Sequence, residues 1–116
     1  MARLRKQTLD GNIETLILAS LEAGPSYGYQ IGRELNEKAG DLLQLGEGTI
    51  YPVLHRLEER ELIAATWRKG DTGRQRKYYR LTPKGRRALA GNREQWAGLV
   101  QVMQAVLDPP AQPRTR

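Results

Sequence analysis

Apolar residues recur at helical spacing in the first third of the chain. One predicted helix face has the spacing i, i+3, i+4, i+7 and i+8 and comprises Ile13, Leu16, Ile17, Ser20 and Leu21. The pair Gly24-Pro25 ends this helix. A second helix, which Ser26 can cap and Gly40 can end, has an apolar or aromatic residue every four positions at 27, 31 and 35.

A third helix is predicted to begin near Gly48-Thr49. Its core face comprises Ile50, either Val53 or Leu54, and Leu57. Pro52 is tolerated there because the first four N–H groups of a helix have no intrahelical acceptor.

Two strands and a last helix follow. Residues 62–69 and 75–81 alternate as strands do, with a glycine-containing tip between them. The pair Thr82-Pro83 then starts a final helix, because a hydroxyl cap followed by proline in the first turn is typical of a helix N-terminus.

The predicted order of helix, helix, helix, strand, strand and long helix is the layout of a winged helix-turn-helix. The fold class is therefore mainly α (α+β), with a two-stranded β wing and a long C-terminal dimerisation helix. We assign residues 8–82 to a winged helix-turn-helix DNA-binding domain and residues 83–108 to the dimerisation helix. Residues 1–7 and the proline-rich residues 109–116 are expected to be flexible termini.

Positive charge is concentrated between Arg68 and Arg87. This stretch holds nine basic residues and one acidic residue, a net charge of +8, whereas the whole chain carries +6. The rest of the chain is therefore slightly acidic in sum. A basic hairpin on a near-neutral body is typical of an element that binds a polyanion.

Composition excludes several other classes of protein. The chain has no cysteine, which excludes disulfides, thiolate metal sites and a cysteine nucleophile. Its apolar runs fall far short of the ~20 residues that span a bilayer, so we expect a cytoplasmic protein without a membrane partner. His55 is the only histidine, and although Glu58 and Glu59 follow it, no second histidine or nucleophile completes a catalytic or metal site. We therefore expect neither an enzyme nor a cofactor.

The third helix is the candidate recognition helix, because the second helix of a helix-turn-helix motif enters the major groove. Its outward-facing residues suit phosphates, base edges and the thymine methyl group: Thr49, Tyr51, Pro52, His55 and Arg56. Tyr27 joins this set of expected DNA contacts. A merely solvated polar face is the alternative. Because acidic residues at 58, 59 and 61 would repel phosphates, the N-terminal half of the helix is expected to approach DNA.

The second predicted strand has two different faces. Tyr79 and Leu81 share one face and are expected to contact the core. The residues next to the hairpin tip are expected to reach a minor groove or the phosphate backbone, with a steep dependence of affinity on salt: Arg74, Gln75, Arg76 and Lys77. A hairpin with a charged, solvated exterior is the alternative, which the one-sided charge disfavours.

The last helix carries two apolar faces. A heptad-like seam comprises Leu89, Trp96, Val100, Met103 and Leu107, and an adjacent face comprises Leu99, Val102 and Val106. We expect the first helix, through Leu16, to cover one face and a second copy of the chain to cover the other. The resulting homodimer would read a palindromic operator on double-stranded DNA. A monomer with a buried terminal helix is the alternative.

Trp96 lies in the middle of this seam. It is either interface core or part of a cavity at the dimer axis that stacks on a planar aromatic ligand. The polar step Asn92-Arg93 interrupts the seam near its start.

Three segments resemble the PadR family of bacterial transcriptional regulators, in its short subgroup: GPSYGYQI at 24–31, GTIYPVLHRLEE at 48–59 and GRQRKYYRLTPKGRRAL at 73–89. The resemblance implies a homodimer joined through the C-terminal and first helices, and repression by operator binding. It also implies release by an effector, and some relatives are similar in having a tryptophan, here Trp96, that stacks on planar aromatic drugs. Glu61 departs from the family pattern, which often has glycine there, the residue that suits a left-handed helix end. Either glutamate is strained in that conformation, or the turn into the wing differs.

Two other functions make different predictions. A non-specific or architectural DNA-binding protein would bind any duplex with similar affinity and would tolerate changes at Tyr51 or His55. A dimer that uses the wing on acidic protein partners would not bind duplex DNA at physiological salt. A sequence-specific repressor would instead prefer its operator by at least ~10³-fold over random DNA.

Overall fold

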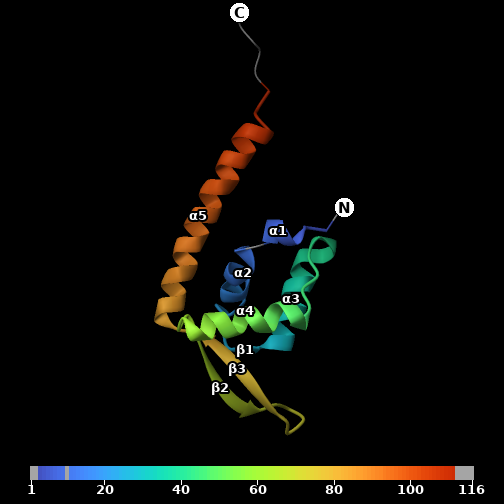
Figure 1. The fold of residues 1–116 in the computed structure, drawn as a ribbon, viewed down its shortest axis with the longest axis vertical. Helices are drawn as coiled ribbons and strands as arrows, with labels where there is room; N and C mark the ends of the chain where they lie inside the picture. The colour runs from blue at the N-terminus through green and yellow to red at the C-terminus, as the bar shows by residue number, and fades with distance from the viewer. Residues whose placement is uncertain (1–2, 10, 112–116) are drawn as a thin grey trace, which may run out of the picture.

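The computed structural model describes residues 3–9 and 11–111. Its elements are, in chain order, α1 (Lys6–Leu9), α2 (Asn12–Ser20), β1 (Ser26–Tyr27), α3 (Gly28–Ala39), the 3-10 helix η1 (Gly40–Leu42), α4 (Glu47–Glu59), β2 (Ile63–Lys69), β3 (Gln75–Leu81) and α5 (Pro83–Leu107). Figure 1 shows α2, α3 and α4 gathered at the centre, the β2–β3 hairpin projecting on one side and α5 extending away in the opposite direction. The predicted winged helix-turn-helix with a long C-terminal helix is confirmed.

The core lies where α2, α3 and α4 meet the base of the sheet and the start of α5. Its buried residues are Ile17, Leu18, Leu21, Ile31, Leu35, Leu43, Leu45, Ile50, Val53, Leu54, Leu57, Leu62, Ile63, Tyr79, Leu81 and Leu89. Both Val53 and Leu54 are buried, so the core face of α4 includes both alternatives. Helices as short as α2 are marginal alone, and this shared apolar contact stabilises them.

The sheet has a third strand, β1, which the sequence pattern does not predict. Ser26 pairs with Tyr79 and Tyr27 with Tyr78, so the strand order is β1-β3-β2 and the pairing is antiparallel. The predicted capping role of Ser26 is wrong, because its hydroxyl donates to the side chain of Gln30 at 2.9 Å and Tyr27 is the N-cap of α3. Pairing with β3 holds Ser26 in the sheet, before the helix begins.

Pro52 lies deeper in α4 than the sequence reasoning placed it. The helix begins at Glu47 with Gly46 as its N-cap, so Pro52 is its sixth residue, beyond the four N–H groups that lack acceptors. The carbonyl of Gly48 therefore has no i+4 donor. Because Gly48 is exposed, water can hydrogen-bond to that carbonyl, which lowers the cost of the proline.

α4 ends in a left-handed turn at Glu61. Its φ is 61°, and among the residues that the structure describes it is the only non-glycine residue with a positive φ. The N–H of Glu61 donates to the carbonyl of Glu58, and the N–H of Leu62 donates to the carbonyl of Leu57, both at 2.9 Å. This is the pairing of a Schellman motif. Of the two alternatives for Glu61, a strained left-handed residue or a different turn, the structure has the left-handed residue.

Two side-chain hydrogen bonds join the start of α5 to the end of α4, and a third caps α5 itself. Its hydroxyl caps α5, as predicted, by accepting from the N–H of Gly85 at 3.0 Å. The same hydroxyl donates to the carbonyl of Glu61 at 2.7 Å. Nearby, Lys84 Nζ donates to the carbonyl of Arg60 at 3.0 Å. The C-terminal carbonyls of α4 are therefore bound by the first turn of α5.

This joint requires glycine at position 85. A β-carbon there would collide with the carbonyl oxygen of Leu62. That oxygen also accepts a hydrogen bond from the N–H of Thr82 at 3.2 Å. The first turn of α5 therefore lies directly against the backbone that leaves α4.

The N-terminal segment contains ordered structure from Leu4 onward. The N–H of Leu4 donates to the carbonyl of Leu42 at 2.9 Å, and α1 begins at Lys6. The predicted flexible terminus over 1–7 therefore overlaps a helix. At the other end, residues 109–111 form no helix or strand. Residues 1–2 and 112–116 lie outside the described residues.

Candidate nucleic-acid interface

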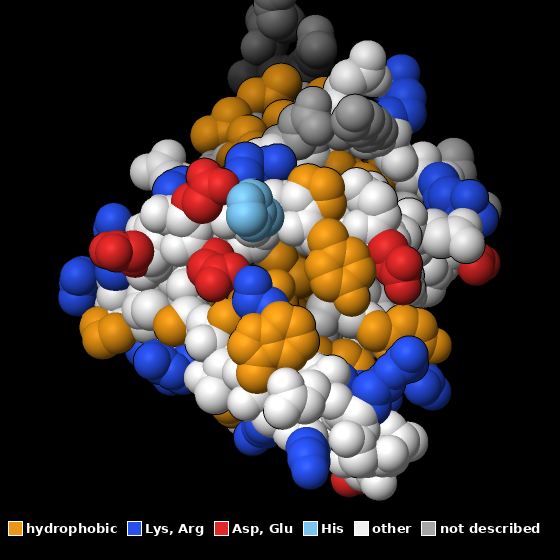
Figure 2. All heavy atoms as spheres, turned by 60° about the horizontal axis from the view of Figure 1, so that its bottom comes forward, with side chains coloured by type: hydrophobic (Ala, Val, Ile, Leu, Met, Phe, Trp, Pro, Cys, Tyr) orange, Lys and Arg blue, Asp and Glu red, His pale blue; other side chains and the backbone are white. Residues whose placement is uncertain are grey.

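α4 presents its outer face to solvent. All five residues predicted to face outward are exposed: Thr49, Tyr51, Pro52, His55 and Arg56. The helix places them there because its apolar positions are buried on the opposite side. In Figure 2 the pale blue histidine lies on this face, close to acidic side chains and above a group of exposed hydrophobic side chains. The predicted exposure is confirmed, while contact with DNA stays a prediction.

Two acidic residues near the C-terminal end of α4 lie against basic side chains of the same chain. Glu59 Oε1 lies 2.9 Å from His55 Nε2, and Glu58 Oε1 lies 3.0 Å from Lys77 Nζ. In the N-terminal half, the acid is Glu47 in the first turn. The acidic charge is therefore greater at the C-terminal end, which favours approach of a polyanion to the N-terminal half.

An open groove of about 470 Å³ separates the N-terminal half of α4 from the wing. Its lining is largely aromatic and basic and includes Tyr27, Tyr51, Trp67, Arg74, Arg76 and Lys77. Tyr51 rests on the first turn of α3, since an added β-carbon on Gly28 would lie only 2.7 Å from the Tyr51 ring. The absence of a side chain at Gly28 therefore sets the position of this wall of the groove.

Trp67 is a member of this groove that the sequence reasoning missed. It lies on β2, opposite Lys77 of β3, and its side chain is 62% exposed. Strand alternation places it on the same side as Ala65, which packs against the core. At position 67 the hairpin has passed the edge of the core, so the indole faces solvent. An exposed indole beside basic groups can pack on the apolar surface of a ligand.

The four wing residues predicted to reach DNA differ in exposure: two are exposed, and two are half-buried against other side chains. Arg74 and Gln75 are exposed near the hairpin tip. Arg76 is half-buried, with its guanidinium carbon 4.4 Å from the centre of the Tyr27 ring. Lys77 is also half-buried, and its hydrogen bond to a glutamate of α4 raises the pKa of its ammonium group above the ordinary range. Lys77 therefore keeps its charge but already has an acidic partner.

Arg68 is a second arginine of the wing that lies on an aromatic ring. Its guanidinium carbon is 3.7 Å from the centre of the Tyr78 ring. The rings of Tyr27 and Tyr78 in turn meet edge to face, with centroids 5.3 Å apart. Arg68 belongs to the basic stretch of the sequence, but no sequence pattern predicts this contact.

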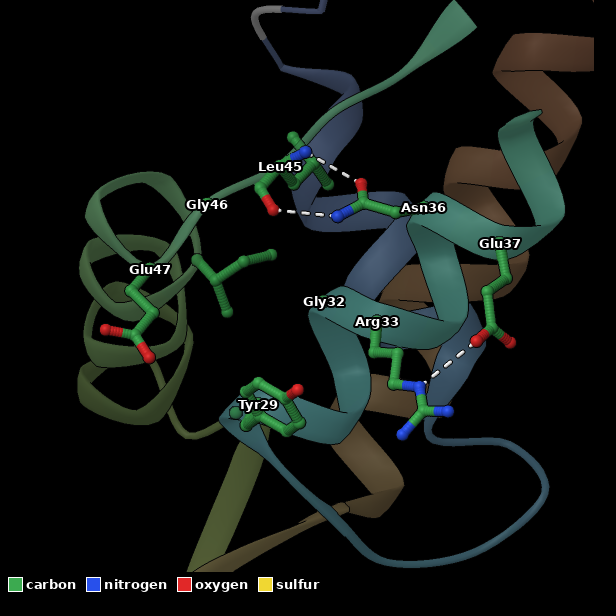
Figure 3. Close-up of a pocket in the computed structure, with 10 residues that line it drawn as sticks. Tyr29, Gly32, Arg33, Asn36, Glu37, Leu45, Gly46 and Glu47 are labelled. Atoms are coloured by element: carbon green, nitrogen blue, oxygen red, sulfur yellow. Dashed lines mark hydrogen bonds and ion pairs between the residues drawn. The ribbon is translucent and has the colours of Figure 1, made fainter. Parts of the chain in front are cut away.

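A hydrogen-bonded clip sets the position of α4 against α3. The side-chain amide of Asn36 donates to the carbonyl of Leu45 at 2.9 Å and accepts from the N–H of the same residue at 2.7 Å (Figure 3). Leu45 directly precedes Gly46, the N-cap of α4. The clip therefore fixes the turn of the helix-turn-helix motif, beside an open cavity of about 480 Å³. The sequence reasoning did not identify Asn36.

The second half of α5 leaves an apolar stripe uncovered. The stripe comprises Trp96, Leu99, Val100, Val102, Met103, Val106 and Leu107, of which Val100 is half-buried and the others are exposed. Trp96 is 58% exposed and Leu107 is 70% exposed. Within the chain, α5 packs on α2 only through its first half, as Figure 1 shows. The stripe continues the helix face that is buried in that first half.

Leu89 does not belong to the uncovered stripe, contrary to its predicted place in the dimer seam. It is 2% exposed and lies in the core of its own chain, so a partner chain cannot contact it in this conformation. Leu16 of α2 packs against the same core and is half-buried. α2 therefore covers α5 at this level.

The polar step in α5 also binds α2 and the turn after it. Asn92 Nδ2 donates to Thr15 Oγ1 at 3.0 Å, and Arg93 Nη1 donates to Glu22 Oε2 at 2.8 Å. The Arg93 guanidinium lowers the pKa of Glu22 below its ordinary value. These contacts lie within one chain, so the surface left for a partner begins at Trp96.

Neither a cluster of metal ligands nor a helix that could span a bilayer occurs in the part of the chain that the structure describes. Within residues 3–9 and 11–111, no group of three or more His, Asp or Glu side chains is placed to hold a metal ion. No helix in those ranges combines the length and the apolar character needed to cross a bilayer.

Comparison with known proteins relates the whole fold to transcriptional regulators. The sequence pattern of the Transcriptional regulator PadR-like family matches residues 17–91. A PadR-like transcriptional regulator from Bacillus cereus has a similar structure, with a TM-score of 0.79 and 31% identity, covering 89% of this chain and 98% of the other. A PadR family transcription regulator from Clostridium difficile is also similar, with a TM-score of 0.75 and 34% identity, covering 84% and 99%. A transcriptional regulator of Mycobacterium tuberculosis is 48% identical over 50 residues, which are 43% of this chain and 46% of that relative.

Proposed function

Since the chain belongs to the PadR-like family of transcriptional regulators, it regulates transcription by binding DNA, and we propose that it acts as a homodimeric repressor that a small-molecule effector releases from a palindromic operator. The observation that carries the DNA-binding geometry is that Tyr51, on the exposed face of α4, and the basic wing border one open groove. The proposed homodimer and the proposed effector site depend on the uncovered stripe of α5.

In this proposal α4 enters the major groove and the wing lies over the adjacent backbone or minor groove. Tyr51, His55 and Arg56 are exposed on α4 and offer groups that can distinguish base edges. Arg74 and Gln75 at the wing tip supply phosphate or minor-groove contacts. Base contacts determine which sequence is bound, and phosphate contacts supply most of the salt-dependent affinity.

The proposal assigns the stripe of α5 to a second copy of the chain. Large apolar side chains from Trp96 to Leu107 are exposed together, whereas soluble monomers rarely expose contiguous apolar patches of this kind. A two-fold axis along the stripe would bury the same residues on both chains. The two α4 helices would then face successive major grooves of a palindromic site.

Trp96 is the proposed effector contact. It is the first uncovered residue of the stripe, next to the polar contacts of Asn92 and Arg93. In a dimer it would lie where apolar interface meets polar groups, a setting suited to stacking on a planar aromatic ligand. Trp96 as plain interface core is the competing interpretation.

The DNA-binding proposal is tested by fluorescence anisotropy at about 150 mM salt. The duplexes come from the DNA upstream of the protein's own gene, with scrambled duplexes of equal length as controls. A repressor of its own gene is expected to prefer a palindromic upstream site by about 10³-fold or more. Equal affinity for both duplexes would instead favour the non-specific or architectural function, or an operator elsewhere in the genome.

Dimerisation is tested by sedimentation of two matched variants of α5. Val102→Lys places a charge in the stripe, while Gln101→Lys places the same charge on the opposite face of the helix. We expect Val102→Lys to shift the protein toward monomer and Gln101→Lys to leave its mass unchanged. Identical behaviour of the two variants would remove the stripe from the interface.

Effector binding is tested by tryptophan fluorescence. The chain has two tryptophans, so the test uses the Trp67→Phe variant, in which Trp96 is the only source of tryptophan emission. A planar aromatic ligand is expected to quench Trp96, and Trp96→Ala is expected to lower the affinity measured by calorimetry. Ligand binding without any change in Trp96 emission or accessibility would contradict this assignment.

A further inference from the structure

The outer face of the wing holds two arginines directly opposite each other. Arg68 of β2 and Arg76 of β3 are register partners, so their side chains leave the sheet on the same side. Like charges opposite each other on adjacent strands repel. This arrangement is unfavourable in the isolated protein unless something else holds the two groups.

Tyrosine rings, and not carboxylates, hold these arginines. Arg68 lies over Tyr78 at 3.7 Å and Arg76 lies over Tyr27 at 4.4 Å, and the two rings contact each other edge to face. Within the described residues, neither arginine forms an ion pair, whereas Arg33, Arg60, Lys77 and Arg93 each pair with a glutamate.

Stacking leaves the binding capacity of a guanidinium intact. The cation is attracted by the ring face, while its N–H donors point outward in the guanidinium plane. A carboxylate partner would instead neutralise the charge and occupy those donors. Arg68 and Arg76 are therefore held in place with their charge uncompensated, and an anion bound between them would relieve their mutual repulsion.

We propose that Arg68 and Arg76 form a clamp for the phosphodiester backbone of duplex DNA, and that Tyr27 and Tyr78 are positioning residues that hold the two guanidinium groups. The proposal rests on the DNA-binding function given above and extends it to Arg68, Tyr78 and the role of the rings. Arg76 and Tyr27 also line the groove beside α4, so the clamp borders the same interface. Because phosphates carry no sequence information, the clamp adds affinity equally on any duplex.

The test measures binding of the full chain to a specific and a scrambled duplex between about 100 and 400 mM salt. Arg68→Gln and Arg76→Gln are each expected to reduce the slope of log affinity against log salt by about 0.9, which corresponds to about fivefold at 150 mM relative to 1 M. The double variant is expected to lose about thirtyfold by the same relation. Each loss should be equal on both duplexes.

Lys38→Gln is the matched control, because it removes the same charge from an exposed position near the end of α3, and that end of the helix lies farther from the wing than its start does (Figure 1). It should leave the slope unchanged. Thermal unfolding separates binding from folding: Arg68→Gln should unfold close to the temperature of the natural chain, since it removes the like-charge pair together with the favourable contact to Tyr78.

The role of the rings is tested by Tyr78→Phe and Tyr78→Leu. Phenylalanine keeps the ring under Arg68 and should retain affinity, whereas leucine should reproduce the loss seen with Arg68→Gln. Arg68→Lys, which keeps the charge without the planar group, should fall between Arg68→Gln and the natural chain.

The outcomes distinguish the clamp from the proposed function. If the natural chain binds DNA and the two Gln variants match it in affinity and slope, the clamp is refuted. A loss of affinity confined to the specific duplex would also refute the clamp, because that result indicates contacts with base edges and not with phosphates. Failure of the natural chain to bind any duplex would refute the proposed function itself, and the clamp with it.

Discussion

Replacing Glu61 by glycine is expected to stabilise the protein. Glu61 ends α4 in the left-handed conformation with φ at 61°, where a β-carbon crowds the following carbonyl group. Its side chain is exposed. The hydrogen bonds at this position come from its backbone, to Glu58 and from Thr82, and glycine keeps both of them.

The magnitude follows from two opposing contributions. The left-handed conformation costs a residue with a β-carbon about 1–2 kcal/mol. Against this gain, glycine lowers the free energy of unfolding by about 0.4–1 kcal/mol, because the unfolded chain has more conformational freedom at glycine and loses more of it on folding. The net gain for Glu61→Gly is therefore about 1 kcal/mol in the free energy of unfolding, which for a chain of this length raises Tm by about 4 °C.

Urea unfolding followed by circular dichroism measures this gain as a higher midpoint with an unchanged slope. All variants are compared at one protein concentration, because association shifts apparent stability. Glu61→Gln tests the negative charge at the helix C-terminus, and Glu61→Ala removes both charge and side chain but keeps the β-carbon. If Glu61→Ala stabilises as much as Glu61→Gly, backbone conformation is not the cause and the reasoning fails.

Three further predictions concern the joint, the clip and the contact between α2 and α5. Gly85→Ala should destabilise by about 2–3 kcal/mol in urea, because its β-carbon must displace backbone, whereas Gly91→Ala, with open space at its β-carbon, should not destabilise. Asn36→Ala should cost about 2 kcal/mol, since it removes two hydrogen bonds at the start of α4, and it should also weaken DNA binding measured by anisotropy. Arg93 lowers the pKa of Glu22 from 4.5, so this contact stabilises the fold above pH 4.5 and is lost as pH falls through the lower folded-state pKa. Glu22→Gln should therefore flatten the dependence of Tm on pH in the acid range; an unchanged profile would contradict it.

The sequence predicted those elements whose signals are local. Thr82-Pro83 specifies the start of α5, and the alternating residues on each side of the hairpin tip specify β2 and β3. β1 has only two residues, Ser26 and Tyr27, too few for any periodicity. It exists because a strand about fifty positions later pairs with it, and no local pattern contains that information.

The candidate interface was predictable where a helix sets the faces. The burial of one side of α4 necessarily exposes Tyr51, His55 and Arg56. Trp67 and Arg68 were not predictable in the same way, because strand alternation gives two faces without showing where the sheet passes the edge of the core. Asn36 was also missed, because its partner Leu45 lies in an irregular segment nine positions away.

Leu89 shows a different limit of pattern reading. It has the spacing of the apolar seam of α5, seven positions before Trp96. Whether a given turn of that helix contacts its own domain or a partner depends on how far α2 reaches along α5. That length is a property of the packed structure and is absent from the spacing of apolar residues.

The joint between α4 and α5 makes the long helix a lever. Two side-chain hydrogen bonds and the close approach of Gly85 bind the first turn of α5 to the end of α4, so the two helices turn together. At ~1.5 Å per residue, the 25 residues of α5 reach about 37 Å. In the proposed homodimer, a change of about 5° in the angle between the two α5 helices would move one α4 by about 3 Å relative to the other over that length. In such a dimer, side chains at the far end of α5 would therefore set the spacing between the two recognition helices, and with it the length of DNA between half-sites.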